Sequence, residues 1–232
     1  MEVVRNSEPK SNFLKKVRKL ATDKKIILIF DECTSGFRQT YGGIHKSYGV
    51  EPDMAIFGKT LGNGYAINAI IGKKEVMEAA KSTFISSTFW TERIGPTAAL
   101  ETIKSMEKIK SWKIVSNIGK KIKKNWSIIA KENKVSINIQ GIDSLANFSF
   151  NSSNHLHYKT FISQEMLKKK ILASNAIYAS IAHTPKILDR YFDALNEIFK
   201  KIKKSENKSE KIENLLETKL CISGMRENNY KK

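Results

Sequence analysis

The alternation of apolar and polar residues in the first half of the chain predicts helices and strands in turn. Ser11 is a suitable N-cap for a helix whose apolar positions recur at helical spacing: Phe13, Leu14, Val17, Leu20 and Ala21. Residues 26–30 (IILIF) form a continuous apolar run, typical of a strand buried on both faces of a parallel sheet. Further strands are predicted at residues 54–57 and 66–71, and helices at 73–81 and 95–108. This alternation indicates an open α/β sheet.

The second half of the chain has a different pattern. Its predicted elements are a long amphipathic helix (112–132), two alternating strands (135–141 and 146–150), a helix (160–170), a strand (176–181) and a last helix. Thr184 and Pro185 are a favourable start for that last helix, which runs to about residue 204. We therefore expect a sheet domain over residues 1–110 and a smaller α+β domain with a basic tail over residues 111–232.

Length and composition are those of an ordinary globular protein. The chain has 232 residues, of which 41% are hydrophobic, enough for a sizeable core. Its longest apolar run, residues 26–30, is far too short to cross a membrane, and Met1-Glu2 does not resemble the basic start of a signal peptide. The two cysteines form no disulfide framework, so we expect a reduced, cytoplasmic protein without a membrane partner.

The net charge of +18 raises the possibility of a nucleic-acid partner. The lysines, however, fall at polar positions of amphipathic helices, and the densest runs are residues 120–126 and 200–211. No aromatic–basic recognition pattern or zinc-finger spacing accompanies these runs. We interpret the charge as solvated surface and expect no nucleic-acid partner.

Asp31 and Glu32 stand directly after the apolar run, at the end of a predicted strand. In open α/β sheets, ligands bind outside the carboxyl ends of the strands, so a carboxylate there can face the cationic nitrogen of a ligand. A helix cap or an ordinary surface pair is the alternative interpretation.

Lys59 lies in the segment FGKTLGNG, enclosed by Gly58, Gly62 and Gly64. A lysine amine is a nucleophile when it is deprotonated, and partial burial favours that form, so Lys59 is a candidate for a Schiff base with a carbonyl compound. The glycines would let a planar cofactor approach the backbone closely. An ordinary solvated loop lysine is the alternative.

A third candidate segment is FISSTFWTERIGP, where Ser86, Ser87 and Thr88 offer hydroxyl groups before a predicted helix. Hydroxyls and backbone N–H groups near a helix start suit a phosphate, although simple helix capping explains them equally. His155 and His157 have no further ligands at metal-binding spacing, so we expect no metal site.

Three stretches of the chain resemble the class III pyridoxal-phosphate-dependent aminotransferases: LIFDECTSGFR (28–38), GVEPDMAIFGKTLGNGYAINAIIG (49–72) and TFISSTFWTERIGPTAALETI (83–103). The resemblance continues through residues 163–184 and extends to residues 215–225. It is nearest to the branch that includes glutamate-1-semialdehyde 2,1-aminomutase. It implies the C-terminal part of an aspartate-aminotransferase-like (fold type I) large domain with a mostly parallel sheet, followed by a small α+β domain.

The resemblance also implies roles for individual residues. Lys59 would hold pyridoxal phosphate as a Schiff base and then move the proton, and Asp31 would pair with the protonated ring nitrogen. Thr88, with Ser87 beside it, would bind the cofactor phosphate of a neighbouring subunit, which implies a homodimer. Cys33 stands where the family usually has Val on the ring face, and Thr34 where many members have Gln or Met near the phenolic oxygen.

Members of this family are about twice as long as this chain, and the resemblance covers their C-terminal half. The other half supplies a Gly-Ser/Thr phosphate loop and an aromatic side chain that stacks on the cofactor. We therefore expect an aminotransferase acting on a small amino donor and a carbonyl acceptor, with weak or no activity in this chain alone. The alternatives are an aminomutase that makes 5-aminolevulinate, and an inactive fragment or a dimerising partner of a separately encoded N-terminal half.

Overall fold

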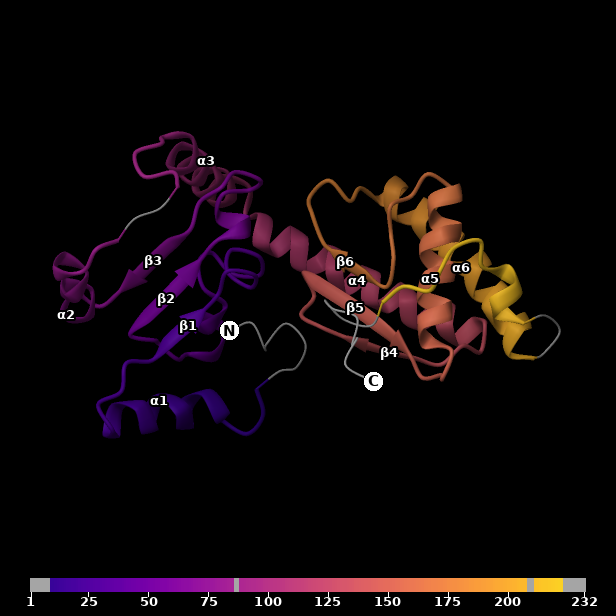
Figure 1. The fold of residues 1–232 in the computed structure, drawn as a ribbon, viewed down its shortest axis with the longest axis horizontal. Helices are drawn as coiled ribbons and strands as arrows, with labels where there is room; N and C mark the ends of the chain where they lie inside the picture. The colour runs from indigo at the N-terminus through magenta and orange to yellow at the C-terminus, as the bar shows by residue number, and fades with distance from the viewer. Residues whose placement is uncertain (1–8, 86–87, 208–210, 223–232) are drawn as a thin grey trace, which may run out of the picture. The chain divides into compact units, whose positions relative to one another are not determined.

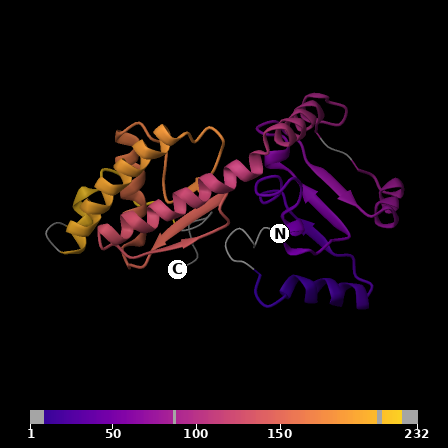
Figure 2. The same ribbon diagram turned by 180° about the vertical axis from the view of Figure 1, so that it is seen from behind.

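The computed structural model describes residues 9–85, 88–207 and 211–222. The chain divides into two compact units, Met1–Asn117 (unit 1) and Ile118–Lys232 (unit 2), which Figures 1 and 2 show from opposite sides. The domains predicted from the sequence, residues 1–110 and 111–232, stay a prediction beside this division.

Unit 1 contains a sheet in the order β1 (Ile29–Asp31), β2 (Met54–Phe57) and β3 (Ala69–Gly72). Strand β1 pairs parallel with β2, whereas β2 pairs antiparallel with β3, so one of the two pairings is parallel. The helices are α1 (Phe13–Asp23), α2 (Lys74–Met77) and α3 (Ile94–Ile109), with 3-10 turns at Ile44–Tyr48, Lys59–Leu61 and Glu78–Ser82. The predicted mixed α/β class and the positions of β2 and α3 are confirmed.

Helices α1 and α3 cover one face of this sheet. Phe30 of β1 packs with Leu14 of α1, and Ala55 and Phe57 of β2 pack with Ala99 of α3. Because side chains alternate along a strand, the residues between these positions point to the opposite face. The register places Ile29, Asp31, Ile56 and Ile70 together on that opposite face.

Two predictions about the start of unit 1 are wrong. The run at residues 26–30 is not buried on both faces: Ile26, Ile27 and Ile29 are all at least half exposed, because helices cover only one face of the sheet in this chain. Ser11 is not the N-cap of the first helix. Asn12 holds that position without a side-chain hydrogen bond, since Ser11 and Asn12 both have positive φ angles and α1 begins at Phe13.

Asp53 joins three segments of unit 1. Its carboxylate binds Arg18 of α1 at 2.7 Å, Lys73 at 2.7 Å and the backbone N–H of Leu28 at 2.8 Å. The hydrogen bond from Leu28, followed by that from Lys73, holds the pKa of Asp53 well below its usual range. Asp53 therefore ties α1 and the entrance of β1 to the turn that precedes β2.

Unit 2 contains a second, antiparallel sheet in the order β4 (Ile137–Gln140), β5 (Leu145–Phe150) and β6 (Ala176–Tyr178). The helices α5 (His155–Lys168) and α6 (Pro185–Glu206) and the 3-10 turn Ile212–Leu215 belong to this unit, whereas α4 (Ser111–Glu132) contributes residues to both units. Thr184 is the N-cap of α6 and Pro185 opens it, as predicted, although the Thr184 side chain makes no capping hydrogen bond.

Aromatic side chains fill the core of unit 2. Trp126 of α4 and Phe148 of β5 are fully buried and meet edge to face, with ring centroids 4.8 Å apart. The indole N–H of Trp126 donates a hydrogen bond to the hydroxyl of Tyr191 on α6, at 2.9 Å. Burial raises the pKa of Tyr191 far above its usual value, so this hydroxyl stays neutral.

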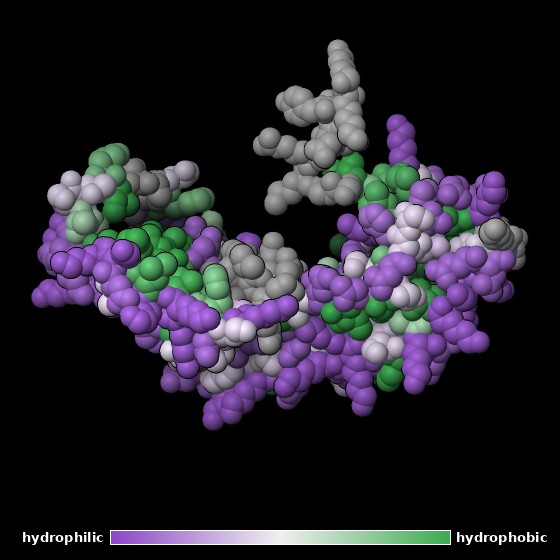
Figure 3. All heavy atoms as spheres, turned by 90° about the horizontal axis from the view of Figure 1, so that it is seen from below, coloured by the Kyte–Doolittle hydropathy of each residue, from purple (hydrophilic) through white to green (hydrophobic). Residues whose placement is uncertain are grey.

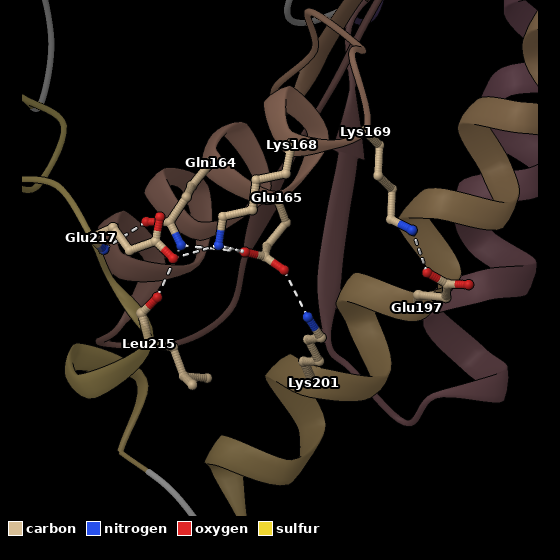
Figure 4. Close-up of polar contacts among 8 residues, drawn as sticks. All are labelled: Gln164, Glu165, Lys168, Lys169, Glu197, Lys201, Leu215 and Glu217. Atoms are coloured by element: carbon tan, nitrogen blue, oxygen red, sulfur yellow. Dashed lines mark hydrogen bonds and ion pairs between the residues drawn. The ribbon is translucent and has the colours of Figure 1, made fainter.

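A charged network fastens the end of the described chain to unit 2 (Figure 4). Glu165 of α5 is almost fully buried and accepts hydrogen bonds from Lys168 and from Lys201 of α6, each at 2.7 Å. Its neighbour Gln164 donates to the carbonyl of Leu215 and accepts from the N–H of Glu217. These bonds hold residues 215–217 against α5.

No helix in the described ranges has the length and apolar character that would let it cross a membrane.

Candidate functional site

Lys59 begins the 3-10 turn that follows β2 (Lys59–Leu61). Its φ angle is +43°, a left-handed conformation that lysine rarely adopts and that is typical of functional sites. The ammonium group donates a hydrogen bond to the hydroxyl of Thr34, at 2.5 Å. Two segments that lie 25 residues apart in sequence are thus joined at the Lys59 side chain.

Asp31 ends β1 and points to the face of the sheet that no helix of unit 1 covers. Its Oδ1 accepts a hydrogen bond from the backbone N–H of Cys33 at 3.0 Å. That bond is the main reason why the pKa of Asp31 lies below its ordinary value; burial opposes it, and the positive charge of Lys59 adds to it. Asp31 is therefore an ionised carboxylate within electrostatic range of Lys59.

Gly58 leaves space at the centre of this cluster. A Cβ atom at Gly58 would lie 2.2 Å from Oδ1 of Asn68 and 3.4 Å from the sulfur of Cys33. A side chain at this position would therefore displace Asn68 and press on Cys33. The absence of a side chain brings Cys33 and Asn68 close to the backbone beside Lys59.

Thr34 is held from both of its polar ends. It is 1% exposed, its hydroxyl accepts the bond from Lys59, and its carbonyl accepts a 2.6 Å hydrogen bond from Arg38. A fixed hydroxyl gives the flexible lysine side chain a defined direction.

Two residues beside this cluster were not singled out as a pair by the sequence reasoning. Glu32 is completely buried, and its carboxylate accepts hydrogen bonds from the N–H groups of Ile44 and His45 and contacts Nδ1 of His45 at 2.8 Å. The strand alternation that turns Asp31 outward turns Glu32 inward. Nothing in the sequence pattern around His45 pointed to this contact.

The predicted phosphate-binding segment is only partly described. Ser86 and Ser87 lie outside the described residues, and Thr88 is an exposed turn residue before α3. The N–H groups of Ile94 and Gly95 at the start of α3 donate to the carboxylate of Glu92, so Glu92 occupies this helix start. Within the described part of the chain, no hydrogen bond joins Thr88 to Asp31, Cys33, Thr34 or Lys59.

The geometry fits the ring-holding end of a pyridoxal phosphate site. An amine and an ionised carboxylate stand at one sheet end, the two groups needed for the aldehyde and for the protonated ring nitrogen. Among the described residues, the buried side-chain oxygens without a partner are those of Ser35 and Thr60, each next in sequence to a member of the Lys59–Thr34 pair. Buried polar atoms are normally satisfied, so this region of the chain has unused hydrogen-bonding capacity.

The described residues contain no group of three or more His, Cys, Asp or Glu side chains that could hold a metal ion. His157 instead lies 3.6 Å from Glu213.

Solved structures with the same fold are PLP-dependent enzymes or are described as transaminases. The PLP internal aldimine form of the FumI protein of Sphingopyxis sp. MTA144 superposes with a TM-score of 0.78 at 20% identity, covering 88% of this chain and 50% of FumI. Ornithine delta-aminotransferase of Plasmodium falciparum gives a TM-score of 0.73 at 21% identity, covering 85% of this chain and 53% of that enzyme. These similarities confirm the predicted fold type I architecture.

Sequence comparison gives the same grouping. The chain is 33% identical to 3-aminobutyryl-CoA aminotransferase of Cloacimonas acidaminovorans over 202 residues, and 31% identical to glutamate-1-semialdehyde 2,1-aminomutase of Methanococcus vannielii over 217 residues. Each match covers 84% of this chain and 49% of the relative, so the chain spans about half the length of these relatives. The family profile Aminotransferase class-III matches residues 6–202. The chain belongs to the class-III aminotransferases.

Proposed function

We propose that this chain carries the lysine and the ring-binding carboxylate of a pyridoxal-phosphate-dependent aminotransferase, which moves an amino group from a small donor to a carbonyl acceptor. The observation that carries the proposal is the cluster at the sheet end. Lys59, in a left-handed turn and bonded to Thr34, lies within electrostatic range of the ionised Asp31.

Each residue of the cluster has a task that its contacts support. When bound, pyridoxal phosphate supplies an aldehyde that reacts with amines and a ring that takes up electrons from the bond being broken. Asp31 accepts a hydrogen bond from the protonated ring nitrogen and, as an anion, keeps that proton in place. Lys59 holds the aldehyde carbon and, once released by an amino substrate, takes the proton from the substrate carbon and returns it as a general acid.

The neighbouring residues shape the site. Cys33, whose sulfur faces the space left by Gly58, packs on one face of the ring. Thr34 holds the amine of Lys59 until substrate arrives and lies near the phenolic oxygen of the ring. Ser87 and Thr88 bind the cofactor phosphate of a second subunit, so the complete enzyme is a homodimer, and the protein acts in the cytoplasm.

A second candidate reaction is the conversion of glutamate-1-semialdehyde to 5-aminolevulinate. Support for it comes from the relatives, because the aminomutase of Methanococcus vannielii is nearly as similar to this chain as the aminotransferase of Cloacimonas acidaminovorans. An aminomutase would convert glutamate-1-semialdehyde without an added acceptor, whereas an aminotransferase requires one.

The test is chemical trapping at a named lysine. The chain is incubated with excess pyridoxal phosphate, reduced with borohydride and digested, and the labelled peptide is identified by mass spectrometry. We expect the label on Lys59 and its loss in Lys59→Arg. Lys110→Arg is the matched control, because Lys110 is also a lysine with a left-handed φ angle, +52°, at the end of α3.

A label on other lysines that survives in Lys59→Arg contradicts the proposal. Turnover of amino donors is measured in parallel, and we expect weak or no activity from this chain alone. Robust turnover by the chain alone would show that the matched half suffices for catalysis.

A further inference from the structure

One face of the unit 1 sheet is apolar and open. Ile29 of β1 and Ile70 of β3 lie on this face and are 50% and 53% exposed, and Ile56 of β2 lies between them in the register. Figure 3 shows hydrophobic residues open at the surface of unit 1, which lies at the left. Strands that pair in parallel are normally covered on both faces, so this open face is unusual for its class of sheet.

Both edges of the same sheet are also open. The order β1-β2-β3 leaves β1 and β3 each with one neighbouring strand in the described part of the chain. An edge strand presents backbone N–H and C=O groups that readily pair with another strand. Neither β1 nor β3 carries a proline or a lysine that would discourage such pairing.

Asp31 shares the open face with Ile29, Ile56 and Ile70. A polypeptide that covers these isoleucines therefore reaches the edge of the candidate cofactor site. It would remove water from the surroundings of Asp31 and supply cofactor contacts that this chain lacks. The open face and the incomplete site are two aspects of one missing layer.

We propose that this face, with the free edges of β1 and β3, is the docking surface for a polypeptide equivalent to the half of the class-III aminotransferases that this chain does not match. The relatives are about twice the length of the match, so a segment of similar size exists in them to form the missing layer. The partner pairs with both edge strands and covers the face between them. The inference rests on the proposed function only in that the same partner completes the site around Asp31.

A second copy of this chain is a poorer occupant. Each copy carries a net charge of +18, so two copies repel each other. A second copy would also bring the same matched half of the family, and would leave the layer beside Asp31 without its missing residues.

The experiment measures binding without cofactor. The half of the Cloacimonas acidaminovorans aminotransferase that this chain does not match is expressed separately and titrated into the chain, with calorimetry for affinity and light scattering for mass. The two halves of that aminotransferase, mixed in the same way, show that the assay detects such a complex. We expect a one-to-one complex, in which β1 and β3 exchange backbone hydrogen for deuterium more slowly.

Substitutions then locate the surface. Ile70→Lys places a charge on the open face, and we expect it to weaken binding by about 100-fold or more, because the ammonium group would be buried without a partner. Ile70→Thr keeps the preference for a strand and should weaken binding by a smaller factor. Leu20→Lys is the matched control: Leu20 is 58% exposed on α1, which covers the opposite face, so its change should leave binding unaltered. Circular dichroism of each variant confirms that the chain stays folded.

Three results overturn the proposal. They are the absence of a complex when the halves of the relative bind each other, equal weakening by Leu20→Lys and Ile70→Lys, and self-association of the chain through the Ile70 face. The trapping experiment at Lys59 is read separately. A complex without a label on Lys59 rejects the proposed function and keeps the docking surface, whereas a label without a complex does the reverse.

Discussion

At the residue scale, the sequence identified the outward-facing members of the site and missed the inward-facing pair. Asp31 and Lys59 stand out because a charge is unusual after an apolar run or inside a glycine-rich turn. Glu32 and His45 meet only when the loop between them closes, and neither spacing nor periodicity encodes that closure. The left-handed φ angle of Lys59 is likewise a property of the folded turn.

The carboxylate of Asp31 is the first residue to test. We expect Asp31→Asn to weaken pyridoxal phosphate binding about tenfold or more, because a charge-assisted hydrogen bond to the ring nitrogen is replaced by a neutral one. The measurement is a fluorescence titration with the cofactor. Asp23→Asn, at the exposed end of α1, is the control, and equal affinities of Asp31→Asn and the unchanged chain would remove the assigned role of Asp31.

The space at Gly58 makes a second prediction. Gly58→Ala should lower the yield of borohydride-trapped label at Lys59 several-fold, because the added methyl group meets Asn68 and Cys33 and shifts the segment that holds the amine. Gly49→Ala is the comparison: a Cβ at Gly49 meets no atom, although its left-handed φ angle adds local strain. A full yield from Gly58→Ala would show that the site tolerates this displacement.

At the scale of elements, the sequence predicted most helices and strands, and its main error was environmental. The run at residues 26–30 has the composition of a doubly buried strand, yet three of its isoleucines are at least half exposed. Composition reports the environment for which a strand is suited, which here includes a covering layer outside this chain. The network at Glu165 could not be predicted, since it joins residues from α5, α6 and the following turn.

The core of unit 2 depends on a single buried polar pair. Tyr191→Phe should lower the free energy of unfolding of unit 2 by about 1–3 kcal/mol, because the indole N–H of Trp126 would be buried without an acceptor. Urea unfolding followed by tryptophan fluorescence measures the change. Tyr65→Phe, at an exposed position of unit 1, should change the midpoint little, and an equal shift in the two variants would contradict the assigned role of the bond.

Glu165 should make the stability of unit 2 dependent on pH. Burial alone would raise the pKa of Glu165, but hydrogen bonds from Lys168, Lys201 and Gln164 lower it from 4.5 to about 2. Since the unfolded chain then binds the proton more readily, the stabilisation by Glu165 is present above about pH 5 and is lost as the pH falls towards 2. Urea midpoints at pH 7 and pH 3 should differ less in Glu165→Gln than in the unchanged chain. Glu132→Gln, exposed at the end of α4, should keep the full difference.

At the scale of the whole molecule, the two units differ in how completely they bury their sheets. In unit 2 the central strand β5 is largely buried and lies against α5, with Phe148 and Phe150 in its aromatic core. In unit 1 the sheet has an open apolar face and two open edges. Local opening is easiest where few buried contacts oppose it.

Hydrogen–deuterium exchange should therefore separate the units. We expect the backbone amides of β3 to exchange at least about tenfold faster than those of β5, because opening β3 breaks fewer buried contacts. Mass spectrometry of peptic peptides measures the two rates in one sample. Equal protection of β3 and β5 would mean that the unit 1 sheet is as stable as a fully covered one.

The open sheet has a consequence for the amount of this protein in a cell. Chaperones and proteases act on polypeptides that expose apolar strands, so a chain with an uncovered sheet is degraded faster than its covered complex. Synthesis in excess of its partner would then add little to the steady-state level. The abundance of the chain would follow that of the polypeptide that covers Ile29 and Ile70, and the ratio of the two would be set by turnover as well as by expression.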